Sequence, residues 1–247
     1  SSQNHPKTKV KIYIKSRFVM LWFIGFGISG IDGISTSALQ VLKKANVVYF
    51  EDFTSPIGRT ELAKIKKLVK GKLVVAPRWM VEDGKAILAD AKKKTVALLA
   101  YGDPYIATTH IELRVRAESE KIKTKTIHNA SAITSLIGEC GLHYYKMGKP
   151  VTIMRENASM STVYYTLYEN MLKGSHTMFI LEYNSDAGFF LDPKDALTKI
   201  IESEKEQKRN IVDESTFAIV ASRIGSKNQN ITAGKISKMI KYDFGKP

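Results

Sequence analysis

The chain has 247 residues, of which 44% are apolar, so it can bury the core of one large domain or of two compact ones. Its single cysteine, Cys140, excludes an intrachain disulfide and any metal site built from several cysteines, which suits a reducing compartment. The formal net charge is +14, and residues 1–17 carry basic side chains without an acidic one.

We expect residues 1–17 to form a flexible basic extension outside the folded domains. The apolar run of residues 18–31 that follows has the order of a signal peptide. Three glycines interrupt this run, however, and it is too short to span a bilayer. A buried strand followed by a glycine turn explains it better, and no other segment reaches the roughly 18 consecutive apolar residues of a membrane helix. The sequence therefore predicts a cytoplasmic protein without a membrane span.

Strands and helices are predicted to alternate through the first half of the chain. Continuous apolar runs predict buried strands, and apolar residues at a spacing of 3.6 predict helices. The expected elements are a strand at 18–24, a helix capped by Ser35 or Thr36, a strand at 47–50, a helix at 61–69, a strand at 73–76, a helix at 86–94 and a strand at 96–100. This alternation is typical of a parallel α/β sheet.

The second half of the chain has more widely spaced strands and longer insertions. The expected strands lie at 151–154, 177–181 and 217–221, and the expected helices lie near 161–172, 193–205 and 232–240. We therefore predict a boundary near Ala132, between an N-terminal α/β domain of residues 18–132 and a C-terminal α/β domain of residues 133–247.

Two glycine-containing loops follow predicted strands, at the sheet edge where parallel sheets bind ligands. Gly25-Phe26-Gly27 does not match the dinucleotide fingerprint, because the expected helix begins only after Ser35. Either a tight turn with glycine at positive φ or a ligand-binding loop fits it. Asp103, in the Gly-Asp-Pro string of residues 102–104, follows the strand at 96–100. Its carboxylate could bind ribose hydroxyls or an amino group, although an ordinary turn also explains the string.

Other polar residues at predicted strand ends are candidates for catalytic or metal sites. His128 could be a base, a ligand or a structural hydrogen bonder. His110, His128 and Asp103 lie in separate loops without the spacing of zinc ligands, so we expect no metal. Glu51 and Asp52 are neighbours on a strand and should face opposite ways, which argues against a paired-carboxylate site. No nucleophile motif is present, so the sequence predicts no catalytic residue.

Lysine clusters at residues 64–72, 92–94 and 121–125 are interpreted as solvated faces of helices and loops. Arginine is scarce in them and aromatic residues do not interleave them, so they do not favour nucleic-acid binding. An acidic protein partner would be attracted by the same positive field.

Taken in order, several segments resemble the diphthine synthases, a family within the tetrapyrrole-methylase superfamily. The Gly-Asp-Pro-x-x-Ala-Thr-Thr-His string that begins at Gly102 is the most specific of them, and residues 110–117 (HIELRVRA) resemble the archaeal members. The resemblance leaves out the basic extension. The matching segments are LWFIGFGIS (21–29), FEDFTS (50–55), YGDPYIATTHIELRVRA (101–117), IHNAS (127–131), GLHYYKMGKPVTI (141–153), GSHTMFILE (174–182), ASRIGS (221–226) and ITAGKISKMIKYDFG (231–245).

This resemblance implies a two-domain α/β fold with a mainly parallel sheet in the first domain and a mixed sheet in the second. It also implies a homodimer, and the cofactor S-adenosylmethionine in the cleft between the domains, with S-adenosylhomocysteine as its product. Several cofactor contacts would be made by backbone groups, so apolar side chains at those positions are no objection. By motif position, the contacts would be Ile28, Asp103, Ile106, Ser131, Ala132, Leu181 and Ile224.

The reaction that the resemblance implies is methyl transfer to the α-amino nitrogen of a modified histidine on translation elongation factor 2. Because the sulfonium methyl is already activated, we expect positioning to matter most and no general base to be indispensable. The sequence departs from the family at two places, and the second is expected either to weaken cofactor binding or to require a partner that covers the gap. Gly30 and Gly33 flank Asp32 where acidic residues are usual, and the sequence stops before a further strand and histidine. A related methyltransferase acting on RNA or a tetrapyrrole, and a non-catalytic binding protein, are the alternatives.

Overall fold

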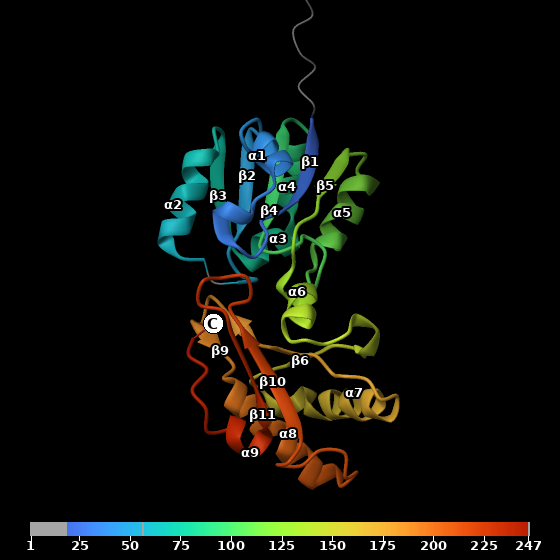
Figure 1. Cartoon of the computed structure of the whole chain (residues 1–247). Helices are drawn as coiled ribbons and strands as arrows, with labels where there is room; N and C mark the ends of the chain where they lie inside the picture. Colours follow the sequence, from blue (N-terminus) through green and yellow to red (C-terminus); the bar gives the residue numbers. More distant parts are fainter. Residues whose placement is uncertain (1–18, 56, 247) are drawn as a thin grey trace, which may run out of the picture.

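The computed structural model describes residues 19–55 and 57–246, so the predicted basic extension of residues 1–17 lies outside the described residues. Two α/β halves follow one another along the molecule, with the first half above the second in Figure 1. Among the described residues, none of the helices combines the length and the apolar character that crossing a bilayer requires.

The first half contains a five-stranded parallel sheet in the order β3-β2-β4-β1-β5. Its strands are β1 (Met20–Gly25), β2 (Val47–Glu51), β3 (Lys72–Ala76), β4 (Thr95–Ala100) and β5 (Thr124–Ile127). The central strands β1 and β4 are almost wholly buried, which explains why they read as continuous apolar runs. The predicted parallel sheet is therefore confirmed.

Helices cover both faces of this sheet, and alternate strand residues pack on opposite sides. Leu98 belongs to the core beneath α3 (Arg78–Asp83), α4 (Lys85–Ala91) and α5 (His110–Ser119), whereas Leu99 belongs to the core beneath α1 (Thr36–Leu42) and α2 (Arg59–Leu68). Ser35 caps α1 as expected, because its hydroxyl accepts a hydrogen bond from the Ala38 amide at 3.2 Å.

The second half combines helices with parallel and antiparallel strand pairs. β6 (Val151–Ile153) pairs in parallel with β7 (Phe179–Leu181). β8 (Tyr183–Asn184) and β9 (Phe189–Phe190) form an antiparallel pair, as do β10 (Phe217–Ser222) and β11 (Asn230–Lys235). The helices are α6 (Ala132–Glu139), α7 (Met160–Leu172), α8 (Pro193–Gln207) and α9 (Ile236–Met239), with 3₁₀ turns at Gly30–Gly33, Tyr144–Lys146 and Asn157–Ser159. The domain boundary near Ala132 stays a prediction; α6 begins at that residue.

The helix predicted at residues 232–240 was wrong over most of its length. Residues 230–235 form β11, and only Ile236–Met239 are helical. Ile236 and Met239 are buried and spaced three apart, which produced the apparent helical pattern. The preceding residues instead pair with β10, from Phe217 opposite Lys235 to Ser222 opposite Asn230, so long-range pairing determines their conformation.

Candidate functional site

Three loops from the carboxyl ends of adjacent strands β4, β1 and β5 are joined by hydrogen bonds. Gly27 and Gly102 exchange amide-to-carbonyl hydrogen bonds of 3.0 Å, which join the loops after β1 and β4. The Asn129 side-chain amide donates to the carbonyl oxygens of Gly25 (3.2 Å) and Gly33 (3.1 Å), which joins the loops after β1 and β5. Parallel sheets bind ligands at this edge, so the three loops form the candidate site.

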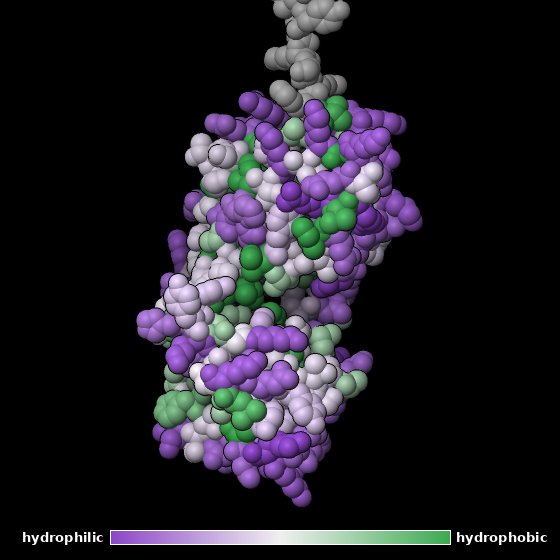
Figure 2. Space-filling model, turned by 90° about the vertical axis from the view of Figure 1, so that its right-hand side faces the viewer, coloured by the Kyte–Doolittle hydropathy of each residue, from purple (hydrophilic) through white to green (hydrophobic). Residues whose placement is uncertain are grey.

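The surface is hollowed next to this edge. Figure 2 shows polar residues over the outer parts of both halves and apolar residues gathered at the waist between the halves, where a hollow opens. Ile28, at the end of the first loop, contacts the second half: a Cβ atom on Gly225 would lie 2.6 Å from the Ile28 Cγ1 atom. Ile28 is a predicted contact residue of the first half, and it lies beside Gly225 of the second half. Gly225 directly follows Ile224, which is another predicted contact residue.

Gly25 is required by the close approach of the three loops. A Cβ atom at this position would lie 2.6 Å from the Gly102 carbonyl oxygen and 2.9 Å from Asn129 Cβ. Gly27 has a φ of 83°, a conformation that favours glycine. The tight-turn interpretation of this string therefore holds, and the turn is also what lets the loops pack together.

We expect Gly25→Ala to lower the free energy of unfolding by about 1–3 kcal/mol, because the added methyl group overpacks a site surrounded by backbone atoms. Urea denaturation measures the change. Gly138→Ala is the control, since a Cβ atom there meets nothing within 4 Å and alanine favours the helix α6. Equal unfolding midpoints for Gly25→Ala and the unmodified protein would contradict the expectation.

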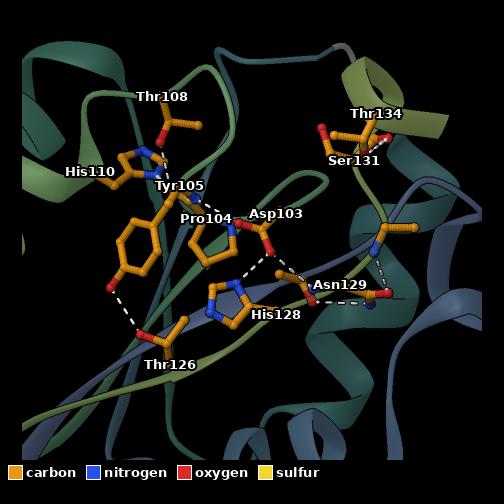
Figure 3. A network of polar contacts seen from close by, with 12 residues as sticks. Asp103, Pro104, Tyr105, Thr108, His110, Thr126, His128, Asn129, Ser131 and Thr134 are labelled. Carbon is orange, nitrogen blue, oxygen red and sulfur yellow. Dashed lines mark hydrogen bonds and ion pairs between the residues drawn. The ribbon is translucent and has the colours of Figure 1, made fainter. Parts of the chain in front are cut away.

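Asp103 connects the loop after β4 with the loop after β5. The residue is 5% exposed, and its Oδ1 accepts a hydrogen bond from the Tyr105 amide at 2.9 Å. Its Oδ2 accepts from the His128 Nδ1 at 2.8 Å and from the Asn129 amide at 3.3 Å (Figure 3). Three N–H groups of the chain therefore stabilise this buried carboxylate. About one of its four lone-pair positions is left for a ligand.

The remaining predicted contact residues lie at the site or in the second half. Ser131 is 5% exposed and caps α6 by accepting from the Ile133 amide at 3.3 Å, and Ala132 begins that helix. A Cβ atom on Gly102 would lie 3.5 Å from Ser131 Cα, which places Ser131 beside the Gly-Asp-Pro string. Ile106 is 38% exposed in the loop that follows this string. Leu181 ends β7 and packs against the core of the second half, and its role stays a prediction.

Glu51 and His110 form a buried pair behind the Gly-Asp-Pro string. The exposed fractions of these residues are both 1%, and the Glu51 Oε2 lies 3.7 Å from the His110 Nε2. Glu51 accepts from the Tyr101 amide at 3.0 Å and from the Thr54 hydroxyl at 2.6 Å. His110 donates from Nδ1 to the Pro104 carbonyl at 3.0 Å, because that oxygen can only accept.

Burial determines the protonation of this pair. Loss of solvation raises the pKa of Glu51 to about 7 and lowers the pKa of His110 to about 4. Between about pH 4 and 7 both groups are therefore uncharged, with the Glu51 carboxyl group protonated and the His110 imidazole neutral. Glu51 is buried at the end of β2, whereas Asp52 is exposed just beyond the strand, as expected for side chains that face opposite ways. Sequence reasoning missed the pairing of Glu51 with His110.

Comparisons with known proteins place the chain in a family. The family model of the tetrapyrrole (corrin/porphyrin) methylases matches residues 20–240. The diphthine synthase of Methanocaldococcus jannaschii is 34% identical over 92% of this chain and 90% of its own length. The diphthine methyl ester synthase of Yarrowia lipolytica is 32% identical over 92% of this chain and 82% of its own length.

A solved structure agrees with these sequence comparisons. A crystal structure of diphthine synthase superposes with a TM-score of 0.77 at 28% identity, over 92% of this chain and 86% of that one. Residues 20–240, which the family model matches, include both halves and the three loops of the candidate site. The chain belongs to the tetrapyrrole (corrin/porphyrin) methylase family and, within it, to the diphthine synthases.

Proposed function

We propose that the chain is a diphthine synthase that transfers methyl groups from S-adenosylmethionine to the α-amino nitrogen of the modified histidine of elongation factor 2. The observation that carries the proposal is the similarity to diphthine synthases over 92% of the chain, and the three site loops lie within the residues that the family model matches. We also propose that it acts in the cytoplasm as a homodimer; both statements follow the family resemblance.

The loops at the carboxyl edge fit the proposed cofactor. Gly25 and Gly27 let the three loops pack closely together at this edge, and Asp103 keeps a lone-pair position for a hydroxyl or amino group. Ser131, Leu181 and Ile224 would complete the contacts from the other loops. When bound, S-adenosylmethionine supplies a methyl group on a positively charged sulfur, which is already activated for displacement. The residues of the chain hold the accepting nitrogen in line and exclude water.

Calorimetric titration with S-adenosylhomocysteine tests the cofactor part of the proposal. We expect micromolar binding with about one site per chain. A second experiment supplies radiolabelled S-adenosylmethionine and elongation factor 2 that carries the unmethylated precursor, with elongation factor that lacks the modification as the control.

The combined results separate the candidate functions. The proposal is supported if the chain binds S-adenosylhomocysteine and if label appears only on the elongation factor that carries the precursor. Binding without label would contradict it and favour an RNA or tetrapyrrole substrate. Absence of binding at millimolar ligand would favour a non-catalytic protein on this fold.

A further inference from the structure

His128 is the first residue after β5, and its ring is held in one orientation. The Nδ1 atom lies 2.8 Å from the Asp103 Oδ2. The ionised carboxylate can only accept a hydrogen bond, so Nδ1 carries the hydrogen in neutral His128. The other ring nitrogen, Nε2, then has a free lone pair. Figure 3 shows Nε2 pointing away from Asp103.

The exposure of the two partners differs sharply. The side chain of His128 is 67% exposed, whereas that of Asp103 is 7% exposed. Within the described residues, Nε2 of His128 has no hydrogen-bond partner. The Tyr105 ring lies with its centroid 5.9 Å from the imidazole, and the Arg114 guanidinium lies 5.7 Å from the Tyr105 ring centre. A buried carboxylate thus orients an imidazole whose basic nitrogen is open to solvent at the candidate site.

We propose that His128 is the proton acceptor that prepares the substrate amine for methylation. This inference rests on the proposed function, because it concerns the nitrogen that receives the methyl group. An α-amino group has a pKa of about 8, so at pH 7 only about one amine in ten is neutral and able to attack. A base at the site makes the neutral form available after the ammonium has bound.

Proton transfer to His128 precedes the transfer of the methyl group. The ammonium N–H bond breaks, its electron pair stays on nitrogen, and the proton forms a new N–H bond on the Nε2 of His128. The nitrogen lone pair then forms a bond to the methyl carbon, and the electrons of the carbon–sulfur bond stay on sulfur. The imidazolium finally releases its proton to water, so one proton is released for each methyl group transferred.

Asp103 has a separate part in this arrangement. It fixes the tautomer and orientation of the imidazole, and its negative charge stabilises the positive charge that His128 acquires, as in other Asp–His pairs. Glu51 and His110 form another acid–histidine pair among the described residues, but they cannot accept a proton from the substrate, because both side chains are fully buried. The proposal departs from the expectation, drawn from the sequence, that no general base is needed.

The first test is His128→Asn, whose amide can still donate to Asp103 but has no basic nitrogen. Single-turnover methylation of precursor-bearing elongation factor 2 should fall about tenfold or more at pH 7, and the deficit should shrink below twofold near pH 9, where water alone deprotonates the amine. Added imidazole should restore part of the rate at pH 7. His143→Asn, an exposed histidine of the second half, is the control and should keep the unmodified rate.

Two measurements are independent of activity. S-adenosylhomocysteine affinity, by calorimetry, should stay within twofold in His128→Asn. Nitrogen-15 NMR of the imidazoles should assign His128 to the Nδ1–H tautomer, and Asp103→Asn should disturb that signal. The chain has five histidines, so the His128→Asn spectrum provides the assignment.

The outcomes distinguish this inference from the proposed function. An inactive unmodified protein would contradict the proposed function. If the unmodified protein is active and the His128→Asn variant is equally active at pH 7, the role of His128 is overturned while the proposed function stands. Loss of cofactor affinity in His128→Asn, or an Nε2–H tautomer, would also overturn it, because the residue would then be structural.

Discussion

Replacement of Asp103 by alanine is expected to lower the affinity for S-adenosylhomocysteine tenfold or more in calorimetric titration. The carboxylate accepts hydrogen bonds from Tyr105, His128 and Asn129, which come from two of the three site loops. Its removal leaves these N–H groups unpaired and deletes the lone-pair position proposed for the ligand. A charge-assisted hydrogen bond contributes about 1.5–3 kcal/mol, which corresponds to the expected loss.

Two further variants sharpen this prediction. Asp103→Asn keeps the size of the side chain and one accepting oxygen, so we expect an intermediate loss of affinity. Asp213→Ala is the matched control, because that exposed carboxylate also accepts several hydrogen bonds, from Ser215 and Thr216 in the second half. A folded Asp103→Ala protein with unchanged affinity would refute the assignment of Asp103 to the cofactor site.

Replacement of Glu51 by glutamine is expected to make the stability of the protein sensitive to acid. Glu51 has its pKa raised from 4.5 to about 7, so it binds more protons in the folded state and its contribution to stability is lost as pH rises across that window. His110 has its pKa lowered from 6.5 to about 4, so its contribution is lost as pH falls through that window. Between about pH 4.5 and 6.5 the two contributions cancel in the unmodified protein.

Glutamine removes only the first contribution, and it can still accept from the Tyr101 amide while its own amide donates toward His110. The free energy of unfolding of Glu51→Gln should therefore rise with pH between about 4 and 6.5, by about 3 kcal/mol in all. His110→Asn should show the opposite slope between about pH 4.5 and 7. Urea denaturation at a series of pH values measures both slopes. A free energy of unfolding that depends on pH in the same way for Glu51→Gln and for the unmodified protein would refute the shifted pKa values of the buried pair.

The sequence predicted the first half well because its signals are local. Uninterrupted apolar runs become strands that are buried on both faces, and the rule that ligands gather at carboxyl ends of strands drew attention to Gly25, Asp103 and His128, which each follow a predicted strand. The strand β11 could not be predicted in the same way. Its conformation depends on pairing with β10, and the buried Ile236 and Met239 that follow it imitate a helix.

The polar pairs of the site were beyond local reasoning for a different reason. Glu51 and His110 lie on different elements, and each is an ordinary surface residue type. Only the packing of α5 on the sheet buries them together and changes their protonation. Asp103 and His128 were both expected at the sheet edge, but the hydrogen bond that fixes the tautomer of His128 depends on how the two loops are positioned relative to each other.

The contact between Ile28 and Gly225 determines when the site can be completed during protein synthesis. Ile28 follows β1, the first of the described strands to be synthesised, whereas Gly225 lies between β10 and β11, close to the last described residues. The nascent chain must therefore keep its first glycine loop without this partner until translation has passed residue 225 and that segment has cleared the exit tunnel. A chain truncated by a premature stop just before that point contains all five strands of the parallel sheet but lacks this wall of the site.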